Sequence, residues 1–187
     1  MGADDTRRDL LVAVGVGVCG GLAGCVGGED DAADLPFERE VDPSRTYLRT
    51  QSDDAGDARS VDLSSLGVDP GLTVRLERLG SFTGSSSDGT GMTGVFSGSS
   101  ELAADVRERV IDAVDAGEDY ETAATFEGNA ETDVPEDFLI ADNENERTST
   151  TVTVPEGATH LFLAAVDNFY QDNEQGDPPF TLRIESA

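Results

Sequence analysis

The sequence predicts an all-β protein, an antiparallel β-sandwich with at most one short helix. Apolar and polar side chains alternate at 72–77 and again at 180–185, which is the pattern of strands with one buried and one solvent-exposed face. Residues 159–166 (THLFLAAV) are apolar on both faces, as expected of a central strand. Several short segments of this kind, separated by turn signals, favour two packed antiparallel sheets.

The remaining elements follow in chain order. Weaker strand patterns are expected at 46–49, 60–66, 92–97 and 138–141, and a further strand at 151–154 leads into a turn at 155–157. Residues 81–91 (SFTGSSSDGTG) are predicted to form a loop of small polar residues. One segment differs from the rest, because Leu102, Val106, Val110 and Val114 recur at a spacing of four behind a serine. This spacing predicts a short helix over 99–114, with a structured crossover as the alternative.

The first 25 residues are predicted to be an export signal. Arg7 and Arg8 precede an apolar run at 10–23 that is interrupted by glycines and is shorter than the roughly 20 residues of a membrane-spanning helix. The sequence Leu-Ala-Gly-Cys ending at Cys25 resembles the lipobox of bacterial and archaeal lipoproteins, in which the cysteine becomes the acylated first residue of the mature chain. Cys19 is a weaker alternative cleavage site.

This interpretation divides the chain into three parts. We expect a twin-arginine lipoprotein signal peptide at 1–24, a flexible acidic tether at 25–34 and a single β-sandwich domain at 35–187. The protein would then fold before export and be held at the extracellular face of the cell membrane through the lipid on Cys25. Both cysteines lie in the signal region, so the domain has no disulfide framework.

The charge of the chain is strongly negative. It contains 39 acidic residues and 12 basic residues, all of them arginine, for a net charge of −27, and removal of two arginines and three aspartates with residues 1–24 leaves −26. Molar salt would screen the resulting repulsion, since the Debye length there is about 3 Å. An acidic surface without lysine resembles the proteins of extremely halophilic archaea. Nucleic acid is excluded as an expected partner, because no basic patch is available to neutralise phosphates.

A candidate metal-binding loop lies between the most apolar strand and the last strand. Asp167, Asp172 and Asn173 place three side-chain oxygens on a short loop, and main-chain carbonyls could add to them. Oxygen ligands of this kind suit Ca²⁺ better than Mg²⁺, which requires near-octahedral geometry and retains its water. The alternative is a solvated acidic loop, because acidic residues are frequent throughout the chain.

Several motifs in a fixed order resemble a known family. They are Asp62–Gly67 (DLSSLG), Gly94–Ser97 (GVFS), Thr132–Phe138 (TDVPEDF) and Val154–Phe162 (VPEGATHLF), followed by Asp167 and Tyr170–Asn173 (YQDN). From residue 60 to residue 184 the chain is similar to secreted, surface-sorted bacterial proteins with a galactose-binding-like β-sandwich. These proteins are related in pattern to calcium-dependent galactophilic lectins.

The resemblance implies a jelly-roll sandwich whose loop before the final strand holds Ca²⁺. The ion would use the side chains of Asp167, Asp172 and Asn173 and a carbonyl near Tyr170, and it would itself ligate the hydroxyls of a carbohydrate. Asn168 and Tyr170 are the expected contacts to that ligand. The chain departs from the family at 174–179, where a short Ser/Gly turn is usual.

The expected function is therefore binding and not catalysis. His160 is the only histidine, and no nucleophile-elbow sequence is present. A hydrolase that uses two carboxylates is one alternative, and a purely structural acidic surface lipoprotein without metal or ligand is another. A second acidic group, Asp133, Glu136 and Asp137, is expected to form a turn ahead of the strand at 138, with further metal ligands as the alternative.

Overall fold

The computed structural model describes residues 35–48, 54–84, 88–104, 109–117, 134–143 and 146–187. All of them belong to one of the two compact units of the chain, Asp31–Ala187. The predicted export signal with Arg7 and Arg8, the lipidation site Cys25 and the tether lie outside the described residues. In the part of the chain that is described, no helix is long and apolar enough to cross a membrane.

A four-stranded antiparallel sheet forms one side of the sandwich. Its strands, in spatial order, are β1 (Phe37–Glu40), β14 (Thr181–Ser186), β5 (Thr73–Leu79) and β11 (Ser149–Thr153). Alternation along β5 and β14 buries their aliphatic side chains and leaves charged ones on the other face, where Arg75 Nη2 lies 2.9 Å from Glu77 Oε1. In the edge strand β1, Phe37 and Arg39 are half-buried while Glu38 and Glu40 are exposed.

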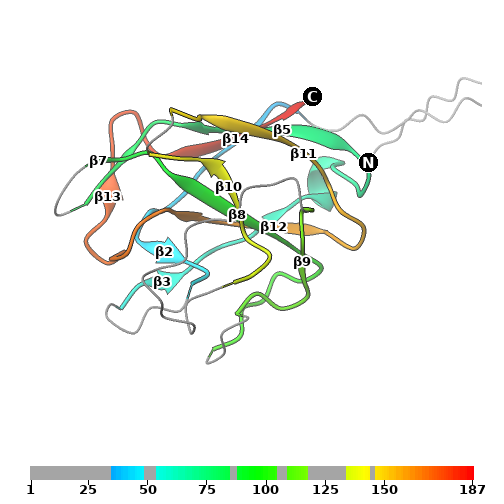
Figure 1. Cartoon of the computed structure of the whole chain (residues 1–187), viewed down its shortest axis with the longest axis horizontal. Helices are drawn as coiled ribbons and strands as arrows, with labels where there is room; N and C mark the ends of the chain where they lie inside the picture. Colours follow the sequence, from blue (N-terminus) through cyan, green and yellow to red (C-terminus); the bar gives the residue numbers. More distant parts are fainter. Residues whose placement is uncertain (1–34, 49–53, 85–87, 105–108, 118–133, 144–145) are drawn as a thin grey trace, which may run out of the picture. The chain divides into compact units, whose positions relative to one another are not determined.

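The second large sheet has five antiparallel strands. Its spatial order is β10 (Phe138–Ala141), β8 (Met92–Ser97), β12 (His160–Ala165) and β4 (Val61–Asp62), with β9 (Ala113–Val114) also paired to β8. Every residue of β8 and β10 is buried, so these strands lie inside the domain. β10 contacts β5 and β11 of the other sheet (Figure 1). The buried apolar side chains of both sheets form one core cluster.

Two small sheets and one short helical turn complete the described fold. Strands β13 (Glu174–Gln175), β6 (Phe82–Thr83) and β7 (Asp88–Gly89) form an antiparallel sheet, and β2 (Arg45–Thr46) pairs in parallel with β3 (Gly56–Asp57). A 3-10 turn, η1, covers Ser64–Leu66. The all-β, antiparallel sandwich predicted from the sequence is thereby confirmed.

The prediction of a short helix over 99–114 is wrong. Leu102 and Val110 form an antiparallel bridge, Ala103 N donates to Arg109 O at 2.6 Å, and Ala113–Val114 is strand β9. A spacing of four is also a multiple of two, so the same residues share one face of an extended chain. Three of the four periodic residues are valine, whose β-branched side chain favours strands over helices. Residues 105–108 lie outside the described part of this segment.

Candidate functional site

The predicted metal loop connects β12 to β13. The carboxylate of Asp167 accepts a hydrogen bond from the main-chain N–H of Asn168 at 2.7 Å, and Asn173 N donates to Tyr170 O at 3.0 Å. Such local bonds are typical of aspartate and asparagine in turns. They fold the loop back on itself directly after the most apolar strand. Residues of this loop line a cavity together with residues of β6 and β7. In the ribbon, the loop lies at one end of the sandwich (Figure 1).

The loop borders a cavity of about 160 Å³. Three carboxylates, those of Asp88, Asp167 and Asp172, line it together with the amide side chains of Asn143 and Asn168. The remaining lining residues are small or apolar and include Phe82, Gly84, Gly89, Val166 and Phe169. The cavity thus collects oxygen atoms from the predicted loop, from β7 and from the segment after β10.

Asn143 holds two walls of this cavity together. Its side-chain oxygen accepts hydrogen bonds from the main-chain N–H groups of Thr90 and Gly91, at 2.5 and 2.6 Å. This contact joins the end of β10 to the chain between β7 and β8. Phe82 packs so closely over Gly89 that any side chain at that position would overlap its ring.

Two of the three predicted metal ligands line the cavity, and the third does not. Asn173 is buried, and its Nδ2 donates to Pro43 O at 3.2 Å. Its side-chain oxygen has no hydrogen-bond partner within the described residues. Of the two expected ligand contacts, Asn168 lines the cavity with an exposed side chain, whereas the side chain of Tyr170 is fully buried in the core.

The carboxylates that share the cavity do not converge on one point. Among the described residues there is no group of three or more His, Cys, Asp or Glu side chains placed to hold a metal ion. His160 is half-buried on β12, with its Nδ1 2.8 Å from Thr159 Oγ1. The chemistry present at the cavity is that of oxygen acceptors and aromatic surface, with no histidine or cysteine among its lining residues.

A buried polar network that the sequence did not reveal lies under the second sheet. The hydroxyl of Tyr47 is 2.9 Å from Thr93 Oγ1 and donates to Asp137 Oδ2 at 3.3 Å. Burial raises the pKa of Tyr47 well above its usual value, and the negative charge of Asp137 raises it further. Asp137 also closes the turn expected at this position, because its N–H donates to Val134 O at 3.1 Å. Asp133, in the same acidic group, lies outside the described residues.

No protein-family model, curated protein or solved structure matches this chain.

Proposed function

We propose that this protein is a non-catalytic binding module of the cell surface, exported by the twin-arginine route and anchored through a lipid on Cys25. In this proposal the cavity beside 167–172 binds Ca²⁺, and the bound ion together with Asn168 and Phe169 receives a carbohydrate. The observation that carries the proposal is that Asp167 and Asp172, expected from the sequence as ligands, line one cavity with Asp88.

The chemical type of the lining side chains suits a hard cation, although in this arrangement they do not converge on one point. Calcium takes roughly six to eight oxygen ligands in flexible geometry, and carboxylates and amide carbonyls are the usual sources. The buried side-chain oxygen of Asn173 accepts no hydrogen bond from the described residues, but Asn173 does not line this cavity and is not counted among the ligands. Asp88 is exposed and Asp167 and Asp172 are half-buried, and in this proposal their side chains rotate toward the ion when it binds.

The carbohydrate part of the proposal follows from the same lining. Carboxylate and amide oxygens accept hydrogen bonds from hydroxyl groups, and the half-buried ring of Phe169 offers an apolar face beside them. A calcium ion with open positions would order two neighbouring hydroxyls without any proton transfer. This chemistry requires neither a nucleophile nor a general base.

The test is calcium titration of the full chain in molar KCl, followed by calorimetry and thermal melting. A ligand that binds only the folded form at a hundred times its Kd stabilises it by about 2.7 kcal/mol, which corresponds to a rise in Tm of roughly 5–10 °C for a chain of this size. Asp167→Asn should abolish the rise. Asp69→Asn, which makes the same charge change at an exposed turn, should leave it intact. Absence of heat and of any rise in Tm with the unaltered protein would remove calcium from the proposal.

A glycan array with and without a calcium chelator then tests the ligand. Glycan binding that is lost when the chelator is added supports a metal-dependent carbohydrate site. Turnover of model glycosides that survives chelation would instead favour the hydrolase alternative, and a calcium response without any glycan binding would leave a metal-stabilised surface domain.

A further inference from the structure

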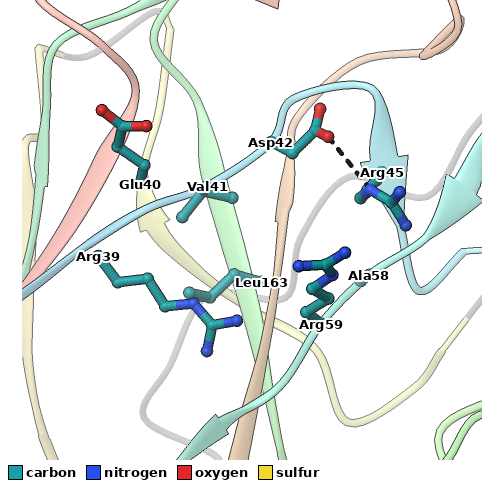
Figure 2. Close-up of a pocket in the computed structure, with 8 residues that line it drawn as sticks. All are labelled: Arg39, Glu40, Val41, Asp42, Arg45, Ala58, Arg59 and Leu163. Carbon is teal, nitrogen blue, oxygen red and sulfur yellow. Dashed lines mark hydrogen bonds and ion pairs between the residues drawn. The ribbon is translucent and has the colours of Figure 1, made fainter.

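A second cavity, separate from the acidic one, gathers positive charge. Its volume is about 240 Å³, and it is lined by Arg39, Arg45 and Arg59 together with Glu40, Asp42, Val41, Ala58 and Leu163 (Figure 2). Three of the eight arginines that the structure describes thus border one cavity, in a chain whose net charge is −27. Arg39 lies on β1, Arg45 lies on β2, and Arg59 follows shortly after the end of β3.

The cavity forms where the edges of the two large sheets meet. β4 pairs with β12 only at His160 and Leu161. The later part of β12, which includes Leu163, therefore has no β4 residue paired with it. The chain at 39–42, continuous with edge strand β1, lies across this gap, and Arg39 Nη1 donates to Ser60 O at 2.6 Å. The buried side chains of Val41, Ala58 and Leu163 form an apolar floor.

The two acidic residues at the cavity do not satisfy all three arginines. Asp42 Oδ2 accepts a hydrogen bond from Arg45 Nε at 3.1 Å. Its other oxygen, Oδ1, accepts hydrogen bonds from the main-chain N–H and the hydroxyl of Ser44. Burial alone would raise the pKa of Asp42, but the hydrogen bonds from Ser44 and the charge of Arg45 outweigh it and lower the pKa. The carboxylate of Glu40 lies on the other side of the β1 chain from the Arg39 guanidinium (Figure 2).

Arg59 is the arginine that remains. It makes no hydrogen bond or ion pair with any residue that the structure describes, and its guanidinium lies between those of Arg39 and Arg45 (Figure 2). Burial lowers the pKa of Arg39, and the like charge of Arg59 lowers it further. Two guanidinium groups that repel each other over an apolar floor would both gain from an anion placed between them.

We propose that the cavity between Arg39, Arg45 and Arg59 binds an oxyanion group, a carboxylate or a sulfate, at the end of a small ligand. The planar guanidinium of arginine matches both groups with paired N–H donors. The volume is below the roughly 300–1,000 Å³ of pockets that enclose drug-sized molecules, so one acidic group and the atoms next to it would fill the cavity. Small molecules that end in a carboxylate or a sulfate group are the ligand class that such a site selects.

The experiment uses the full chain in the lowest KCl concentration at which its circular dichroism spectrum is native. Glucuronate and inorganic sulfate are titrated separately by calorimetry, with ionic strength held constant by chloride, and glucose serves as the uncharged counterpart of glucuronate. Saturable binding of glucuronate or sulfate, and none of glucose, is expected. The stronger of the two anions identifies which oxyanion geometry the site prefers.

Three variants assign the binding to this cavity. Arg59→Gln should weaken binding at least tenfold, and Arg59→Lys, which keeps the charge but loses the paired donors, should weaken it by a smaller factor. Arg75→Gln makes the same charge change at an arginine that does not line the cavity and should leave the Kd unchanged. Arg59 is exposed and makes no contact that holds the fold, so these variants are expected to fold.

Amide chemical shifts supply a second readout on the unaltered protein. On addition of the anion, the signals of residues 39–42 and 58–60 should move together with one saturation curve. Equal binding by the Arg59→Gln variant, shifts spread over the whole surface, or no saturable binding at all would overturn the proposal. Its failure is separate from that of the calcium site, because no residue lines both cavities.

Discussion

The hydroxyl of Tyr47 donates a hydrogen bond to Asp137 across 90 residues of sequence, inside the fully buried part of the domain. The same hydroxyl lies beside Thr93 on β8, and Thr93 in turn donates to Phe138 O at 3.0 Å. The network therefore ties the segment after β2 to two strands of the five-stranded sheet. Polar groups at this depth are costly unless they are satisfied.

Tyr47→Phe should lower the free energy of unfolding by about 1–3 kcal/mol, because it removes a buried hydrogen bond to the carboxylate of Asp137. Denaturant unfolding in molar KCl measures this. Tyr170→Phe removes a hydroxyl from the other fully buried tyrosine among the described residues and gives the comparison for the size of the effect. A Tyr47→Phe variant as stable as the unaltered protein would show that the contact contributes nothing net.

The raised pKa of Tyr47 predicts a loss of stability at alkaline pH. The group stays neutral in the folded state while it ionises near pH 10 in the unfolded chain, so its contribution is complete below about pH 10 and declines above it. The slope contributed by this one group is at most about 1.4 kcal/mol per pH unit. Unfolding measured from pH 8 to pH 11.5 should show this decline, and Tyr47→Phe should remove that part of it.

Arg109 joins three segments, and its removal should be more damaging than removal of its partner. Its side chain donates to Ala103 O at 3.1 Å and to Leu48 O at 3.3 Å and forms an ion pair with Asp57. We expect Arg109→Met to cost about 2–3 kcal/mol of stability, in line with charged hydrogen bonds. Asp57→Asn should cost less than 1 kcal/mol, because the Asp57 side chain is 65% exposed. Equal costs would contradict this assignment.

Gly89→Ala should destabilise the wall of the acidic cavity. A Cβ at this position overlaps the ring of Phe82, which packs edge-on against Phe180 with ring centroids 5.2 Å apart and has little freedom to move. The expected cost is about 1–3 kcal/mol. In a Phe82→Leu background the same substitution should cost measurably less, and a cycle of the four variants tests whether the two residues are coupled.

Stability should depend strongly on salt. The Debye length falls from about 10 Å at 0.1 M to about 3 Å at 1 M, so repulsion among the surface carboxylates declines over this range. We expect Tm to rise steadily with KCl, and thermal melting at a series of concentrations measures it. A Tm that does not respond to KCl would contradict adaptation to brine.

Much of the fold was predictable because strand periodicity is a local signal. The strands predicted at 92–97 and 138–141 have the bounds of β8 and β10, and the apolar run at 159–166 contains β12. The segment at 81–91 was predicted to be a loop but contains β6 and β7, each only two residues long, which is too short for a period to show. The helix at 99–114 was wrong because its spacing suited both periods.

The candidate sites were less predictable, because they depend on which distant residues meet. Asp167 and Asp172 were found from the loop in which they lie, whereas Asp88 and Asn143 join them only through the fold. The polar contacts of Tyr47 likewise arise only in the fold, because its partners come from β8 and from the turn before β10. The arginine cavity was hidden by the acidic composition of the chain.

The edge strand β1 of the four-stranded sheet bears on whether copies of the protein associate with one another. β1 is only four residues long and points Glu38 and Glu40 away from the protein, with Arg183 neutralising the first through a bond of 2.5 Å. An unpaired strand edge can recruit the edge of a second molecule, but a short, acidic one repels its own copy. At high protein concentration, copies of this protein should therefore stay separate and not pair edge to edge into fibres.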